Sequence, residues 1–111
     1  MVTCVKENLL GFVKGAVRSR GGTTHAVATK LPNALGLYDT LGNVWEWCQD
    51  WYGPYAAGSV TNPTGPATGS YRLLRGGVWC VNSSNCRASK RDAFTPDYLD
   101  NCFGFRVARN P

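Results

Sequence analysis

The stretch LGNVWEWCQDWYG, residues 41–53, carries three tryptophans within seven positions and decides the fold. Gly42 and Asn43 are typical of a tight turn, and the residues after them predict an extended segment. Alternation along that segment gives two faces: Trp45 and Trp47 on one, and Val44, Glu46 and Cys48 on the other. The tryptophans therefore predict a core, and Glu46 is a charge among apolar neighbours that needs a partner.

Short apolar pieces and turns continue on the carboxyl side of this stretch. Residues 53–70, GPYAAGSVTNPTGPATGS, have no periodicity and predict a long loop. YRLLRGGVW at 71–79 predicts a strand, and FGFRVA at 103–108 predicts a final strand. Residues 80–102 between them are polar, irregular and rich in turn residues.

One helix is expected on the amino-terminal side. In residues 7–20, apolar side chains recur at spacings of three and four, which places them on one helical face. Together with the short strands this indicates an α+β fold with one or two helices and much irregular loop. A length of 111 residues predicts a single domain, 1–111.

Composition limits the classes of function. The chain is 43% hydrophobic, as expected for a globular protein, yet it has no apolar run long enough to span a membrane and no visible signal peptide. We therefore expect a soluble protein, in the cytoplasm or displayed through other components. The formal net charge is +5, and residues 1–30 hold five basic side chains against Glu7. No nucleic-acid motif accompanies this basic region, so a solvated helix face is favoured over nucleic-acid binding.

The cysteines pose the main question about chemistry. Five cysteines is an odd number, which argues against a secreted disulfide framework. His25 is the only histidine and no CxxC motif occurs, so we expect no zinc site. Cys80 and Cys86 lie six residues apart in GGVWCVNSSNC, and spacing alone leaves a catalytic pair, a disulfide or two unrelated side chains open.

Three pieces together resemble a known family: residues 31–53, residues 71–79, and the closing GFRVARNP at 104–111. The GNVWEW and RGG.W…GFR signatures, in this order, are similar to the carboxyl-terminal part of the formylglycine-generating-enzyme/sulfatase-modifying-factor family. The resemblance implies a compact C-type lectin-like fold with few regular elements. It also implies a calcium-binding role for Glu46, although a salt bridge to Arg75, Arg91 or Arg106, or hydrogen bonds with the backbone, are favoured over calcium.

In that family, catalysis uses two cysteines that follow the RGG.W strand and bind copper. Soft thiolates suit a cuprous ion. Counted from Gly77, Cys86 falls in register with the second of these cysteines, but Val81 stands where the first is expected. Counted back from Arg91, neither Cys80 nor Cys86 aligns with the two catalytic cysteines of the family. We therefore interpret Cys86 as a buried framework cysteine and predict no catalytic residues, no required cofactor and no joint role for Cys80 and Cys86.

The sequence is more similar still to the variable proteins of diversity-generating retroelements, which carry a diversified segment between these landmarks. The resemblance implies mutated Asn codons, which cannot yield Lys, Glu, Gln, Met or Trp. Residues 1–79 contain eleven of these five types, whereas residues 80–111 contain only Lys90. The candidate variable, ligand-binding positions within 80–102 are Cys80, Val81, Asn82, Ser84, Asn85, Asp92, Phe94, Tyr98, Leu99, Asp100 and Cys102.

The leading hypothesis is thus a non-catalytic display domain whose segment 80–102 binds a ligand, most simply a protein. Phe94 and Tyr98 are expected to be exposed as aromatic contact residues, and Phe103 is expected to pack inward. The alternative is a formylglycine-generating-type copper-dependent oxidase, or a fragment of one, that uses Cys80 and Cys86. The sequence leaves the identity of the ligand and the oligomeric state open.

Overall fold

The computed structural model describes residues 23–108, so the helix expected at 7–20 and most of the basic region lie outside the described residues. The strands are β1 (Trp45–Trp51), β2 (Arg72–Arg75), β3 (Asp92–Phe94) and β4 (Phe103–Gly104), with one 3-10 turn, η1 (Ser83–Asn85), between β2 and β3. The described part is therefore a small β-rich domain with long loops. It contains no helix that could cross a membrane.

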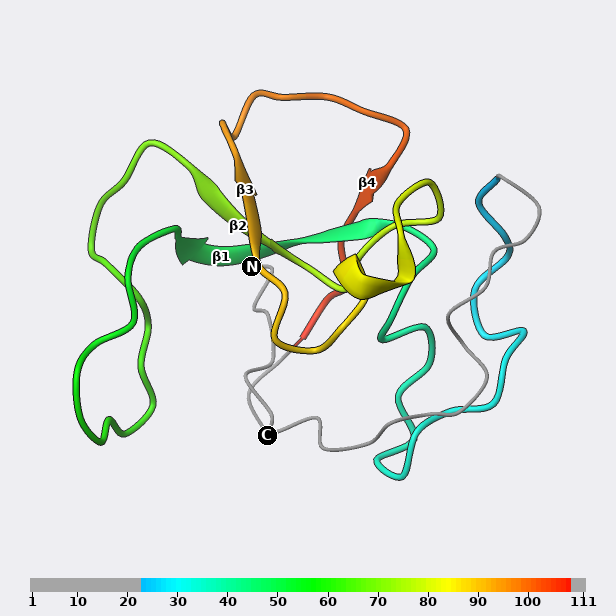
Figure 1. Ribbon diagram of the computed structural model, residues 1–111, viewed down its shortest axis with the longest axis horizontal. Helices are drawn as coiled ribbons and strands as arrows, with labels where there is room; N and C mark the ends of the chain where they lie inside the picture. The colour runs from blue at the N-terminus through cyan, green and yellow to red at the C-terminus, as the bar shows by residue number, and fades with distance from the viewer. Residues whose placement is uncertain (1–22, 109–111) are drawn as a thin grey trace.

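The four strands form one sheet in the order β3-β2-β1-β4. β1 and β2 pair antiparallel, as do β2 and β3, whereas β4 lies parallel to β1 through Trp45 and Phe103. The sheet is strongly twisted, so β3 and β4 run steeply across the direction of β1 (Figure 1). The chain between β3 and β4 passes over one end of the sheet, and its exposed part, residues 95–101, forms an arch (Figure 1).

The core lies where the tryptophan-rich stretch predicts it. Leu74 is 0% exposed and clusters with Trp45 and Val78, while Trp47 and Phe103 pack against them partly buried. The inward packing expected for Phe103 is confirmed. Leu73 and Leu74 are both buried although they point to opposite faces of β2, so both faces of the sheet are covered at this point.

Four expectations about elements need correction. The strand expected at 71–79 spans only Arg72–Arg75, because Gly76 and Gly77 after it adopt positive φ values of 93° and 78°. The final strand spans only Phe103–Gly104 rather than 103–108, and β3 forms inside the segment expected to be irregular. The alternation of side chains between the two faces of β1 also ends before the strand does. Trp47 pairs with Leu74 and Trp51 with Arg72, so two extra residues of β1 bulge out, and Cys48 shares the buried state of Trp45.

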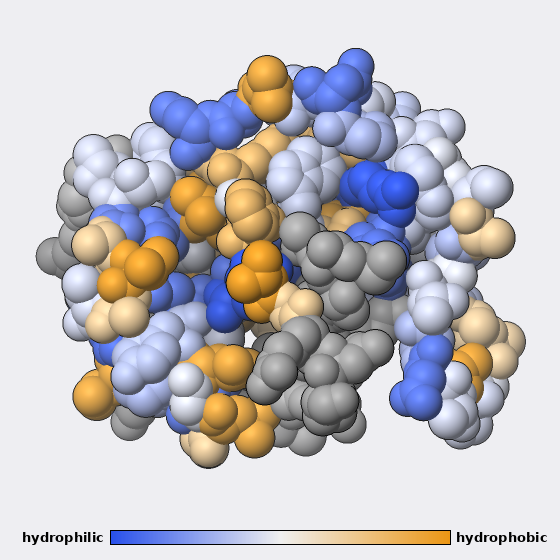
Figure 2. All heavy atoms as spheres, turned by 180° about the vertical axis from the view of Figure 1, so that it is seen from behind, coloured by the Kyte–Doolittle hydropathy of each residue, from blue (hydrophilic) through white to orange (hydrophobic). Residues whose placement is uncertain are grey.

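Residues 53–70 contain no helix or strand, as the sequence predicts. Their loop projects from the body at the lower right of Figure 2, beyond a hollow in the surface. Gly69 lets the loop return against β1, because a Cβ there would lie 3.0 Å from the Cβ of Trp51.

Candidate ligand-binding segment and its cysteines

The segment 80–102 leaves the core at Trp79 and returns to it at Phe103. The backbone N–H of Trp79 donates to the carbonyl of Asn43 (2.9 Å), and the N–H of Trp45 donates to the carbonyl of Cys102 (2.8 Å). Both ends of the segment are therefore attached to the same short stretch, residues 43–45. This attachment follows from the GNVW turn, where Asn43 adopts a positive φ of 65° and is buried.

The structure separates the eleven candidate positions by exposure. Those on the surface are Cys80, Val81, Asn82, Ser84, Tyr98, Leu99 and Asp100, and those half-buried are Asn85, Asp92, Phe94 and Cys102. Leu99 is 92% exposed and Tyr98 is 43% exposed. The surface positions fall in two groups, one around η1 and one in the arch 95–101.

Phe94 departs from its expected exposure. Its ring is half-buried, stacks on Tyr98 at 4.8 Å between centroids and lies 5.2 Å from Phe103. Phe103 in turn makes an edge contact with Trp47 at 5.3 Å. The four rings form a continuous aromatic column from the core to the surface, so the exposed edge of Tyr98 has a rigid base.

Two of the polar candidates, Asn82 and Asp100, stabilise local turns, a role that was not predicted from the sequence. The side-chain oxygen of Asn82 accepts the N–H of Ser84 (3.2 Å) and caps η1. The carboxylate of Asp100 accepts the N–H of Cys102 (2.8 Å). Asn and Asp are typical of such turns, so the signal was present in the sequence. Replacing either residue therefore changes loop geometry as well as surface chemistry.

The cysteines have different partners from those suggested by their spacing. The Cys86 thiol is buried and donates to the carbonyl of Val78 (3.8 Å), in agreement with a framework role. The Cys80 thiol is exposed and lies 3.7 Å from the Sγ of Cys102. The thiol next to Cys80 is thus that of Cys102, while the Cys86 thiol faces the carbonyl of Val78.

The local environment makes Cys102 a weak acid. Desolvation, followed by hydrogen bonds with Cys80 and Asp100, raises the pKa of Cys102 to about 12. Burial also raises the pKa of Cys86, partly offset by its hydrogen bond to the Val78 carbonyl.

We expect these differences to set the order of alkylation by iodoacetamide at pH 8: Cys80 first, Cys102 more slowly, and Cys48 and Cys86 only on unfolding. The reactive species is the thiolate, so the Cys102 rate should rise about tenfold per pH unit up to its pKa. Site-resolved mass spectrometry of timed samples measures this order. Labelling of Cys86 as fast as Cys80 would contradict the placement of both thiols.

Glu46 finds the partner that the sequence required. One oxygen of its carboxylate accepts a hydrogen bond from the Nε–H of Arg106 (2.7 Å). The other oxygen accepts a hydrogen bond from Nη2 of the same side chain. Both carboxylate oxygens of Glu46 are therefore engaged by Arg106. Within residues 23–108, no group of three or more His, Cys, Asp or Glu side chains is placed to hold a metal ion.

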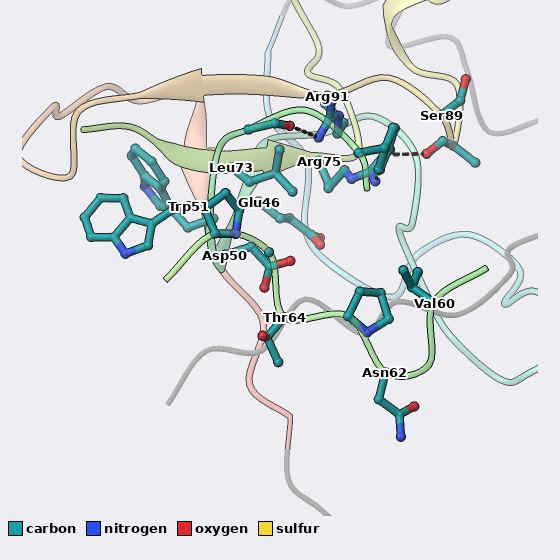
Figure 3. Close-up of a pocket in the computed structure, with 18 of the residues that line it drawn as sticks. Glu46, Asp50, Trp51, Val60, Asn62, Thr64, Leu73, Arg75, Ser89 and Arg91 are labelled. Atoms are coloured by element: carbon teal, nitrogen blue, oxygen red, sulfur yellow. Dashed lines mark hydrogen bonds between the residues drawn. The ribbon is translucent and has the colours of Figure 1, made fainter. Parts of the chain in front are cut away.

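A cavity of about 1250 Å³ lies under the 53–70 loop, on the face where Glu46 and Leu73 point (Figure 3). Its arginines are engaged by the protein itself. Arg75 donates to the carbonyl of Ala88 (3.0 Å), and Arg91 donates to the carbonyl of Gly53 (2.8 Å) and stacks over Tyr55 at 3.9 Å. The contacts of Arg91 with Gly53 and Tyr55 hold the start of the 53–70 loop in place, so these arginines have a structural explanation.

Sequence comparison establishes the family. Residues 5–111 match the sulfatase-modifying factor enzyme 1-like domain. The chain belongs to this family. It is 44% identical to the serine/threonine-protein kinase pkn1 of Chlamydia pneumoniae over 91 residues, which cover 78% of this chain and 15% of the kinase. It is 43% identical to the formylglycine-generating enzyme of Streptomyces coelicolor over 93 residues, which cover 79% of this chain and 30% of the enzyme.

Structural comparison adds a third relative. Treponema denticola variable protein 1 superimposes with a TM-score of 0.72 and 41% identity over 78% of this chain and 32% of that protein. The chain therefore spans about a third or less of each of these relatives. The recognition of a variable-protein-like member of the sulfatase-modifying-factor family is confirmed. The three relatives carry different functional names at nearly equal identity, so family membership alone does not decide the function.

Proposed function

We propose that this domain is a non-catalytic ligand-display module whose segment 80–102 binds a protein ligand. The observation that carries the proposal is the arch 95–101, where every residue is exposed and Tyr98 packs on Phe94 and Phe103 of the aromatic column, with Leu99 next to it in the sequence. Binding surfaces gain most from large side chains that are already rigid, because little conformational entropy is then lost on association. The likeness to the variable protein of Treponema denticola supports the same role.

The second candidate is a copper-dependent oxidase of the formylglycine-generating type, which the likeness to the Streptomyces enzyme favours. The separate environments of Cys80 and Cys86 argue against it. Copper-dependent oxidation of a cysteine-containing peptide, lost in both Cys80→Ser and Cys86→Ser, would overturn the display proposal and establish the oxidase. We expect no such turnover.

The display proposal is tested with two matched libraries on this scaffold. The first diversifies Val81, Ser84, Tyr98 and Leu99, and the second diversifies four exposed positions of the other loop: Val60, Thr61, Asn62 and Thr64. Both are selected against hen lysozyme as a probe protein. We expect folded binders from the first library and far fewer from the second, because the first set includes two positions of the arch, where position 98 lies against Phe94 and Phe103. Equal yields would contradict the assignment of 80–102.

A genomic observation tests the variable character of the segment separately. A template repeat that matches codons 80–102 except at adenines, beside a reverse-transcriptase gene, is the expected finding. Its absence would remove the retroelement part of the proposal, while the library experiment would still decide whether the segment binds ligands.

A further inference from the structure

Cys80 and Cys102 stand at the two ends of the segment 80–102 and face each other across its base. Their Sγ atoms are 3.7 Å apart, so a disulfide, with sulfurs about 2.05 Å apart, needs an approach of only about 1.7 Å. These two positions are 22 residues apart in sequence. Their proximity therefore arises from the fold and not from local spacing.

The backbone explains why the two thiols meet. Trp79, next to Cys80, is hydrogen-bonded to Asn43, and Cys102 itself is hydrogen-bonded to Trp45. Cys80 and Cys102 are thus held beside the same short stretch of chain, residues 43–45. Cys102 has a further restraint, since its N–H donates to the Asp100 carboxylate at 2.8 Å. Cys80 lies in a turn closed by a bond from the N–H of Val81 to the carbonyl of Val78 (3.4 Å), so it has more freedom to move toward its partner.

We infer that Cys80 and Cys102 form a reversible disulfide that closes residues 81–101 into a covalent loop. The oxidant is a low-molecular-weight disulfide of the glutathione type. The bond itself does not depend on the proposed display function. Its consequence for ligand binding does, because the closed loop carries the arch and η1.

The chemistry proceeds by two thiol–disulfide exchanges. The exposed Cys80, as thiolate, attacks one sulfur of the small disulfide, forms a mixed disulfide and releases one small thiol. The Cys102 thiolate then attacks the Cys80 sulfur and expels the second small thiol. The two protons lost by the cysteines are taken up by the two released thiolates. Two protein thiols are thus oxidised by two electrons, and one small disulfide is reduced.

The test treats the full chain with mixtures of reduced and oxidised glutathione, followed by alkylation and trypsin digestion. Cys80 and Cys86 share the peptide GGVWCVNSSNCR (76–87), and Cys102 lies in DAFTPDYLDNCFGFR (92–106). We expect these peptides to be joined, with Cys86 alkylated. The matched controls are Cys86→Ser, which should leave the link in place, and Cys102→Ser, which should leave Cys80 as a stable glutathione adduct.

Two measurements test the consequence of the bond. Oxidation should raise Tm by about 10 °C, because a closed loop of this length restricts the unfolded chain. It should also slow hydrogen exchange of amides in 81–101 about tenfold without changing exchange in 53–70. A persistent glutathione adduct in the unaltered chain, or a link from Cys80 to any other cysteine, would overturn the inference. A link formed without the Tm and exchange changes would overturn its effect on the segment. Failure to bind any ligand in the library experiment would leave the disulfide standing.

Discussion

Replacing Gly77 with alanine should lower the free energy of unfolding by about 4 kcal/mol, a large part of the 5–15 kcal/mol typical of a domain. Gly77 has a φ of 78°, which costs an alanine about 1–2 kcal/mol. A Cβ at this position would also lie 2.6 Å from the Sγ and 2.7 Å from the Cα of Cys86. Such overpacking typically costs a further 1–3 kcal/mol. Urea unfolding followed by tryptophan fluorescence measures the loss.

Gly36 offers a matched control for the backbone contribution. Its φ of 75° is nearly the same, but a Cβ there would meet nothing within 4 Å. Gly36→Ala should therefore lose only the conformational part, about 1–2 kcal/mol. Adding Cys86→Ala to Gly77→Ala should not restore stability, because the clash with the Cα of residue 86 remains. Equal losses in the two glycine variants would contradict the close approach of segment 80–102 to Gly77.

The contact between Gly77 and Cys86 explains why the RGG motif needs its second glycine. In RGGVWCVNSSNC the second glycine is needed because the chain returns nine residues later and places Cys86 directly over it. The framework role of Cys86 was predictable from register, but the tight contact was not, because it joins two segments through a loop whose path has no local signal.

The strands differ in the same way: one was predictable from a local sequence pattern, and another depends on pairing with a distant segment. β1 was predictable because its turn, its tryptophans and its charged residue form a strong local pattern. β3 was missed because DAF at 92–94 carries little strand signal by itself and forms only by pairing with Arg72–Leu74 of β2. That pairing also draws Phe94 toward Phe103, which is why an aromatic side chain among turn residues is half-buried rather than displayed.

The candidate site was predictable as a segment but not in its internal contacts. The codon argument and the RGG.W and GFR motifs on either side together predict that the binding segment is 80–102. They do not reveal that Cys80 and Cys102 face each other, since this follows from the hydrogen bonds of residues 79 and 102 to the 43–45 turn. Long-range backbone attachment of this kind has no periodicity in the sequence to indicate it.

Removing Arg106 should give the second large loss of stability, about 2–3 kcal/mol in Arg106→Met. The guanidinium bridges both oxygens of Glu46 and donates to the carbonyls of Tyr38 and Asp39, each at 3.1 Å. It thereby joins the end of the described chain to β1 and to the loop before it. The Arg106 and Glu46 side chains are 32% and 21% exposed, so the loss is expected below the 3–5 kcal/mol of a fully buried pair.

A double-mutant cycle isolates the contribution of the pair itself. Glu46→Gln combined with Arg106→Met should be less destabilised than the sum of the two single variants, by about 1 kcal/mol or more, because the single Arg106 variant leaves a half-buried carboxylate unpaired. Arg106→Lys should recover little, since an ammonium group cannot hold both carboxylate oxygens and two carbonyls in the fork geometry of arginine. Strict additivity in urea unfolding would show that the four hydrogen bonds act independently and that the charge pair contributes nothing of its own. In that case the GFR motif would be retained for its contacts with the Tyr38 and Asp39 carbonyls alone.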